Sequence, residues 1–255
     1  MVRNRRKAAV VEANEFLNCY EDQKRAEAYA KLEFAGTYYL AYRDLPAIFA
    51  EHVKGKAAID FGCGTGRSTR FLRKHGFHAT GIDISEDMIR KARQLDPEGD
   101  YRLIEDGDFS QFQPNSYDLV LAAFTFDNIA TEEKKVRLFQ ELGGLLNREG
   151  RIVMVVSSPE IYLHEWASFS TKDFPDNRLA ASGDVVKIIV TDHEDRRPVE
   201  DIVWTDAAYR EVFAKAGLAV VQSFEPLAKG DEPYAWVSET TVAPWVIYAL
   251  RRGNG

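Results

Sequence analysis

The stretch AAIDFGCGTGRST, residues 57–69, decides the fold of this chain. An apolar run typical of a short buried strand leads into an acidic residue, a glycine-rich turn and a helix start. Glycine permits the sharp turn and lets a ligand lie against the backbone, because it has no Cβ. The first turn of the helix presents unpaired N–H groups and a positive dipole end. The stretch therefore predicts a binding site for a carboxylate or a phosphate group.

Position 67 distinguishes two kinds of glycine-rich turn. A dinucleotide-binding fingerprint, G-x-G-x-x-G, needs its third glycine there, and this chain has Arg67. The spacing is instead D-x-G-x-G-x-G, from Asp60 through Gly62, Gly64 and Gly66. Arg67 therefore disfavours a nicotinamide-dependent oxidoreductase, which is the alternative enzyme class on a sheet of this kind.

Three motifs in order resemble those of the class I S-adenosylmethionine (SAM)-dependent methyltransferases. For the first, IDFGCGTGRST, the resemblance implies that the glycine loop holds the methionine part of SAM and that Asp60 helps to hold its amino group. The second is a strand over residues 78–84 with Asp83 near its end, at a spacing suited to gripping ribose hydroxyls. Ile84 or Met88 would then supply the apolar contact with the adenine.

The third motif is the acidic run at residues 105–109, in which Asp108 and Phe109 match the family's residues at the adenine edge. Phe124, after the fourth expected strand, would face the cofactor side as well, with core packing as the alternative. The resemblance covers about residues 55–157 with ordered motifs. It implies SAM as the cofactor, S-adenosylhomocysteine as the product and no metal.

Strands and helices alternate over residues 55–157, which predicts a mostly parallel sheet with helices on both faces and ligands at the carboxyl ends of its strands. The resemblance implies a Rossmann-like α/β methyltransferase sheet whose last strand is antiparallel. We expect residues 1–54 to form an N-terminal helical cap and residues 55–255 to form the SAM-binding domain. Residues 158–204 break the alternation and are expected to be an insertion that contains a β-hairpin. The cap would also be the contact of a homo-oligomer.

Composition narrows the classes of partner. The 255 residues carry a net charge of −7, from 33 basic and 40 acidic side chains, and an acidic chain is a poor match for a nucleic-acid backbone. The chain has no apolar run of membrane-spanning length and no signal-peptide pattern. Its two cysteines, Cys19 and Cys63, form neither a zinc pattern nor a disulfide framework. We therefore expect a cytoplasmic protein that binds a small-molecule acceptor and no nucleic acid, membrane or metal.

Catalytic residues are harder to predict, because methyl transfer from a sulfonium is an in-line displacement with a neutral leaving group. The protein mainly aligns the reactants and excludes water, and a general base is needed only where the acceptor brings its proton into the transition state. His164 is the best general-base candidate, because the usual histidine pKa lies near neutrality. Asp127 is a second catalytic candidate, with capping of the following helix as the alternative. The expected substrate contacts are Tyr20 and Tyr39 in the cap and Tyr162, Trp166 and Phe169 in the insertion.

The acceptor is expected to be a small, apolar or aromatic secondary metabolite. FAGTYYLAYRDLP at 34–46 and SETTVAPWVIYAL at 238–250 resemble segments of bacterial secondary-metabolite enzymes, and more narrowly of the C-methyltransferases of teleocidin-type indole terpenoid pathways. That narrower resemblance implies methylation of a prenylated indole, in which aromatic side chains would stabilise a carbocation. Two other classes are alternatives. One is a non-catalytic SAM-binding module, and the other is a nucleic-acid methyltransferase, for which the chain lacks N-P-P-Y-like and Pro-Cys motifs.

Overall fold

The computed structural model describes residues 34–192 and 194–253. Most of the expected N-terminal cap, and Tyr20 with it, therefore lies outside the described residues. The remainder of the cap forms two helices, α2 (Thr37–Arg43) and α3 (Leu45–His52).

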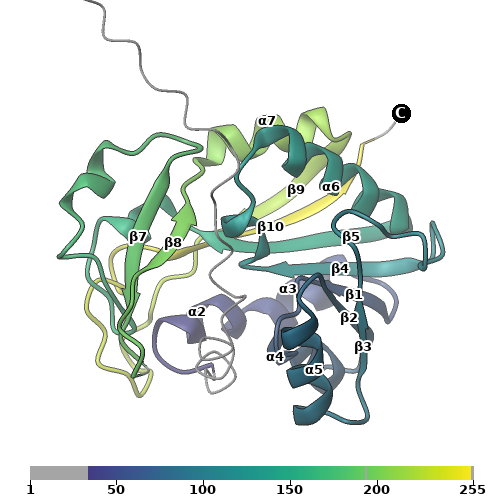
Figure 1. Cartoon of the computed structure of the whole chain (residues 1–255), viewed down its shortest axis with the longest axis horizontal. Coiled ribbons are helices and arrows are strands. Elements are labelled where there is room, and N and C mark those ends of the chain that lie inside the picture. The colour runs from purple at the N-terminus through teal and green to yellow at the C-terminus, as the bar shows by residue number, and fades with distance from the viewer. Residues whose placement is uncertain (1–33, 193, 254–255) are drawn as a thin grey trace, which may run out of the picture.

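A seven-stranded sheet forms the centre of the protein (Figure 1). Its strands are β1 (Ala57–Phe61), β2 (His78–Asp83), β3 (Asp100–Leu103), β4 (Tyr117–Ala123), β5 (Leu146–Ser157), β9 (Leu218–Phe224) and β10 (Trp245–Arg252). They lie in the order β3-β2-β1-β4-β5-β10-β9, and β10 runs antiparallel to both of its neighbours. The expected Rossmann-like α/β sheet with an antiparallel last strand is confirmed.

Helices cover both faces of the sheet. The helices α6 (Glu132–Leu145) and α7 (Asp206–Lys215) lie on one face, and α3, α4 (Arg67–Lys74) and α5 (Glu86–Leu95) lie on the other (Figure 1). Three of these helices begin after a residue whose hydroxyl accepts a free N–H of the first turn. Ser85 accepts from Met88, Thr131 from Lys134 and Thr205 from Ala208. Because both faces are covered, β4 and β5 are buried along most of their length.

The insertion after β5 forms a second, smaller sheet of three antiparallel strands. These are β6 (Phe169–Ser170), β7 (Val185–Val190) and β8 (Val199–Ile202). The pairing of β7 with β8 confirms the expected hairpin, and β6 adds a short third strand that the sequence does not predict. The short 3₁₀ turn η3 (Pro159–Tyr162) lies between β5 and β6, and a second one, η4 (Pro175–Leu179), lies between β6 and β7.

A buried carboxylate ties α2 to the insertion and to the segment before β10. Glu239 is fully buried and accepts hydrogen bonds from Thr37 Oγ1 at 2.7 Å, from the Ala167 backbone N–H at 2.7 Å and from the Val237 backbone N–H at 2.8 Å. Since three donors satisfy this charge, it fixes three segments that are distant in sequence. The start of α2 is therefore held beside the insertion.

Candidate active site

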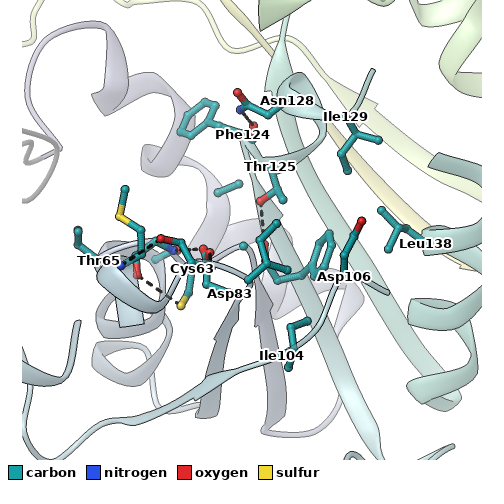
Figure 2. Close-up of a pocket in the computed structure, with 18 of the residues that line it drawn as sticks. Cys63, Thr65, Asp83, Ile104, Asp106, Phe124, Thr125, Asn128, Ile129 and Leu138 are labelled. Atoms are coloured by element: carbon teal, nitrogen blue, oxygen red, sulfur yellow. Dashed lines mark hydrogen bonds between the residues drawn. The ribbon is translucent and has the colours of Figure 1, made fainter. Parts of the chain in front are cut away.

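A cavity of about 320 Å³ opens at the carboxyl ends of β1, β2 and β4 (Figure 2). The glycine loop and Asp83 form one side, and the segment after β4 forms another. The residues that line it include Gly62, Cys63, Gly64, Thr65, Arg67, Ser68, Asp83, Ile84, Met88, Ile104, Asp106, Gly107, Phe124, Asn128, Ile129 and Leu138. This is the position at which doubly wound sheets bind ligands.

The three glycines of the loop have different roles. All three have positive φ angles, 69° at Gly62, 52° at Gly64 and 83° at Gly66, which other residues rarely adopt. A Cβ at Gly62 would collide with Thr125, and one at Gly66 would lie 2.6 Å from the Tyr101 ring. A Cβ at Gly64 would meet no protein atom within 4 Å. The absent side chain at Gly64 therefore leaves space for a ligand rather than for the protein.

Asp83 connects the glycine loop to the next helix. Its Oδ2 accepts the Gly64 backbone N–H and its Oδ1 accepts the Ser85 backbone N–H, each at 2.9 Å. Burial raises the pKa of this carboxyl, and the two N–H donors oppose that rise. Each oxygen keeps a further lone pair, and Figure 2 shows Asp83 beside the loop in the cavity wall. The geometry fits two hydroxyl donors such as those of a ribose.

Asp60 lies behind the glycine loop and is fully buried. Its Oδ2 accepts the hydroxyls of Ser68 and Thr69, both at 2.6 Å, while its Oδ1 has no hydrogen-bond partner. Burial raises the pKa of this carboxyl to about 6, although the two hydroxyls oppose the rise. Asp60 does not line the cavity itself, but an unpartnered buried carboxylate oxygen is costly, and the positive charge of an amino group bound near Ser68 would offset that cost. Ser68 itself lines the cavity.

The other end of the cavity is apolar. Ile84 is 48% exposed and Met88 is buried, and both line the cavity with Ile104 and Leu138. These side chains would sandwich a planar base. The residues present therefore fit the three parts of SAM, with the glycine loop for the methionine part, Asp83 for the ribose and this apolar end for the adenine.

Asp108 and Phe109 do not line the cavity, contrary to the expectation from the sequence. The Asp108 side chain is exposed and accepts the Ser110 backbone N–H, and Phe109 packs in the core against Phe61 at 5.9 Å. The chain turns here through the bond from the Asp108 N–H to the Glu105 carbonyl, which directs Asp108 outward. Asp106 and Gly107 line the cavity instead.

A second cavity, of about 50 Å³, lies next to the first and shares a wall with it. Arg67, Phe124 and Asn128 line both cavities. The remaining residues of the second cavity are Tyr38, Asp127, Ser157, Ile161, Tyr162, Phe169, Ile188, Val190, Val199, Asp201 and Trp245. Most of its lining residues are aromatic or branched aliphatic, and the charged and polar exceptions lie on α4, β5, β8 and η2 (Thr125–Asn128).

Phe124 sits at the junction of the two cavities in a rare backbone conformation. Its φ is 65°, one of two positive values among the described residues that are not glycine. The surrounding structure holds Phe124 in this conformation. Its N–H donates to the Val155 carbonyl at 2.8 Å, and its ring centre lies 5.8 Å from that of Tyr38 and 4.9 Å from that of Trp245. Such strain clusters at functional sites, and here it places an aromatic ring between the cavities.

Asp127 lines the second cavity and is buried beside a buried lysine. Ser157 donates to it from its backbone N–H at 3.1 Å and from its hydroxyl at 3.0 Å. Burial raises the pKa of Asp127 to about 6, and Ser157 and the charge of Lys135 oppose the rise. Burial also lowers the pKa of Lys135 to about 7, while Asp127 opposes that change. The Lys135 ammonium donates to the Phe126 carbonyl and lies 4.9 Å from the Trp204 ring centre.

Asp201 is the acidic residue that the sequence did not single out. It lies on β8, faces the second cavity and accepts the Tyr162 hydroxyl at 3.1 Å. Burial and the nearby charge of Asp127 raise its pKa to about 8. The alternation of β8 gives one usable signal, because Asp201 shares the inward face with Val199.

His164 lies outside both cavities, contrary to its expected role as the base. Its side chain is 40% exposed and its Nε2 lies 3.1 Å from the Glu160 carboxylate. The 3₁₀ turn η3 carries the chain away from the cavity after Tyr162, so that Tyr162 faces inward and His164 faces solvent.

Two residues that were expected to contact the substrate, Trp166 and Tyr39, line neither cavity. Trp166 is buried and its Nε1 donates to the Ile161 carbonyl at 2.8 Å, so it is part of the core rather than of the cavity wall. Tyr39 packs against Tyr234 at 5.3 Å, while Tyr38 lines the second cavity. Neighbouring residues on a helix differ by about 100° in direction, so only one of the two tyrosines can face the site. Tyr162 and Phe169 do line the second cavity.

Two kinds of feature are absent from the described part of the chain, a metal site and a membrane-spanning helix. No three potential ligands among its histidine, cysteine, aspartate and glutamate side chains gather into a group that would hold a metal ion. None of its helices combines the length and the apolar character that crossing a membrane requires.

Residues 59–154 match the family model described as "Methyltransferase domain". A methyltransferase of Geobacillus sp. (strain WCH70), itself uncharacterised, is 37% identical over 101 residues, which are 39% of this chain and 46% of that protein. A relative with the same description from Bacillus licheniformis is 32% identical over 120 residues, 46% of this chain and 55% of the relative. The chain thus spans about half the length of the relatives it matches.

Solved structures share the fold at low sequence identity. A SAM-dependent methyltransferase of Clostridium acetobutylicum superimposes with a TM-score of 0.61 at 13% identity, covering 93% of this chain and 100% of that one. The CcbJ methyltransferase of Streptomyces caelestis gives a TM-score of 0.58 at 16% identity, covering 84% of this chain and 96% of that one. At these identities the likeness is one of fold, and it extends beyond the region that the family model matches.

Proposed function

We propose that this chain, which carries a class I SAM-dependent methyltransferase domain, transfers the methyl group of SAM to a small, largely apolar molecule bound in the second cavity. One observation carries the proposal. The cavity that fits SAM and the aromatic cavity share a wall made by Arg67, Phe124 and Asn128. A methyl group at that wall would lie between its donor and its acceptor.

The chain's own residues would position the reactants and exclude water. When bound, SAM supplies a methyl group activated by its sulfonium. Gly64 and Asp83 would hold the cofactor on one side of the wall. Tyr38 and Phe124 would exclude water on the other side, where their rings meet edge to face at 5.8 Å. Alignment of this kind, without covalent participation of the protein, provides much of the rate enhancement of a displacement.

A second candidate acceptor is a prenylated indole methylated at carbon. The observation that favours it is the set of aromatic rings in the second cavity, contributed by Tyr38, Phe124, Phe169 and Trp245. Aromatic faces stabilise a cation by about 0.5–2 kcal/mol each, and methylation of an alkene leaves a carbocation. The packing of Trp245 against Tyr38 and Phe169, at 5.8 and 5.7 Å, keeps these rings together.

Binding experiments would separate this proposal from the alternatives. We expect SAM and S-adenosylhomocysteine to bind in calorimetry and NAD to give no heat, because Arg67 occupies the position of the third glycine of a dinucleotide fingerprint. Labelled SAM would then be tested for methyl transfer into phenolic, indole, terpenoid and quinone acceptors. Tight binding of NAD instead of SAM would contradict the proposal. SAM binding without transfer to any acceptor would favour a non-catalytic module.

A further inference from the structure

Two buried carboxyl groups from distant parts of the chain meet at the second cavity. Asp127 belongs to η2 and is 4% exposed, and Asp201 belongs to β8 and is 9% exposed. Both line the cavity, whose other residues are mainly aromatic and aliphatic. Burying two acids in apolar surroundings costs stability unless they share a proton or serve a reaction. Packing alone therefore does not account for the pair.

We infer that Asp127 and Asp201 form the proton-accepting group of methyl transfer, and that the acceptor is therefore a hydroxyl compound such as a phenol or an enol. The inference rests on the proposed function. It selects the acceptors that must lose a proton on methylation, in preference to alkenes.

The hydrogen bonds indicate which acid is the base. Asp127 Oδ2 accepts both the Ser157 N–H at 3.1 Å and the Ser157 hydroxyl at 3.0 Å, while Oδ1 receives only the longer contact to that N–H at 3.3 Å. Oδ1 is therefore the oxygen with room for another donor. In Asp201 the Tyr162 hydroxyl occupies Oδ2 at 3.1 Å. No hydrogen bond within the described ranges reaches Asp201 Oδ1.

The surrounding charges separate the two acids. Lys135 on α6 stabilises the ionised form of Asp127, and the charge of Asp127 in turn keeps a proton on Asp201. The pKa values, about 6 for Asp127 and about 8 for Asp201, give one carboxylate and one neutral acid at pH 7. Two acids with separated pKa values commonly mark a base and its partner.

The other ionisable groups around the pair are Tyr162 on η3, Tyr209 on α7 and Arg67 on α4. Burial holds the phenol pKa of both tyrosines well above the usual value, so they remain neutral. The Arg67 guanidinium lies 4.8 Å from the Tyr38 ring centre and lines the same cavity. Its positive charge in this cavity would stabilise an acceptor oxygen as that oxygen loses its proton.

The proton transfer balances without a further reagent. As the acceptor oxygen forms its bond to the methyl carbon, its O–H bond breaks and the proton passes to Asp127 Oδ1. The electron pair of the carbon–sulfur bond goes to sulfur, which leaves as a neutral thioether. Asp127 is then a neutral acid, and it returns its proton to solvent when the product leaves.

A spectroscopic probe tests the proton acceptor without turnover. 4-Nitrophenol absorbs differently as phenol and as phenolate, so its ionisation can be followed on the protein loaded with S-adenosylhomocysteine. We expect bound 4-nitrophenol to remain mainly phenol at pH 7.5, because the negative charge of Asp127 raises the pKa of a phenol beside it, and to shift towards phenolate in Asp127→Asn. Identical spectra in the two proteins, or absence of saturable binding to the wild type, would overturn the inference.

Turnover on phenols of graded acidity gives the second test. With labelled SAM, Asp127→Asn should lower kcat on phenol by roughly 10²–10⁴-fold. On 4-nitrophenol the loss should be much smaller, because a more acidic phenol loses its proton without a strong general base. The wild-type rate on phenol should rise with pH around 6, as Asp127 loses its proton, and the variant should lack this limb. Glu200→Gln removes the adjacent carboxylate of β8, which pairs with Lys187 at 3.1 Å, and is the matched control with unchanged kinetics.

The outcomes separate the inference from the proposed function. If the wild type transfers methyl to an indole carbon or an alkene but to no phenol, the inference is wrong and the proposed function stands. If calorimetry shows no SAM binding, both fail. Should Asp127→Asn not fold, Asp201→Asn serves in its place. This variant removes the neutral acid beside Asp127, so it should lower kcat on phenol at least tenfold. The affinity for SAM should be unchanged, and the rate should still rise with pH around 6. A kcat equal to that of the wild type would overturn the pairing.

Discussion

Replacing Gly64 with alanine should weaken SAM binding while leaving the protein folded. A Cβ at this position would meet no protein atom within 4 Å, so the substitution creates no internal clash. The cost to folding is that of holding a residue with a side chain at a φ of 52°, about 1–2 kcal/mol. For a chain of this size that corresponds to a fall in Tm of roughly 2–8 °C.

The loss in binding is of a different kind. The added methyl group would project into the cavity that fits SAM, so the cofactor would have to shift away from the backbone of the loop. Losing two backbone hydrogen bonds would cost about 1–3 kcal/mol, which corresponds to roughly a 5- to 150-fold rise in Kd. Gly62→Ala differs, because its Cβ would collide with Thr125, and stability and binding should fall together.

Gly217→Ala is the matched control for Gly64→Ala. Gly217 has a φ of 73°, and a Cβ there would also meet nothing within 4 Å, but it follows α7 and lies outside the cavity. It should lose a similar amount of stability and bind SAM normally. Isothermal calorimetry and thermal unfolding of the two variants give both quantities. If folded Gly64→Ala binds SAM as well as the wild type does, the ligand does not lie against this part of the loop.

Three further results are expected. Calorimetry at pH 6 in two buffers should show release of about half a proton on SAM binding, because the ligand's amino group would lower the Asp60 pKa from about 6. Asp60→Asn should abolish this proton release. The same proton release in wild type and variant would argue against an interaction of Asp60 with the amino group. Glu239→Ala should lower the free energy of unfolding by about 2–3 kcal/mol, since it removes the acceptor of one buried and two partly buried donors. A denaturant titration that shows a loss below about 1 kcal/mol would contradict this. Tyr38→Leu should raise the KM for the acceptor and leave the affinity for SAM unchanged. Tyr39→Leu should change this KM less. Equal effects of the two substitutions would refute the assignment of Tyr38 to the face of α2 that lines the second cavity.

The sheet and the placement of the glycine loop beside Asp83 could be predicted because their signals are local. The positive φ of Gly64, the hydroxyl cap of Ser85 and the position of Asp83 at the end of β2 each depend on neighbouring residues only. The alternation of strands and helices then fixes which strand ends share an edge. The sequence is therefore sufficient to place the glycine loop beside Asp83.

The second cavity could be predicted only in part, through Asp127, Tyr162 and Phe169, because the rest of it depends on contacts between distant segments. Periodicity marks α2 as a helix but does not say whether Tyr38 or Tyr39 faces the site, and packing against Trp245 decides this. The pairing of Asp201 with Asp127 requires the insertion to fold back over η2. The placement of His164 depends on the direction in which a short 3₁₀ turn leaves β5. None of these contacts has a sequence signature of its own.

The two cavities draw on different parts of the chain, and this division allows them to evolve separately. No residue of 158–204 is among those lining the larger cavity, whereas seven of the fourteen residues that line the smaller one come from that segment. If the smaller cavity holds the acceptor, as proposed, mutations in the insertion would change which molecule is methylated without weakening SAM binding. During evolution, replacement of residues 158–204 alone would then change the acceptor while the rest of the chain stayed the same.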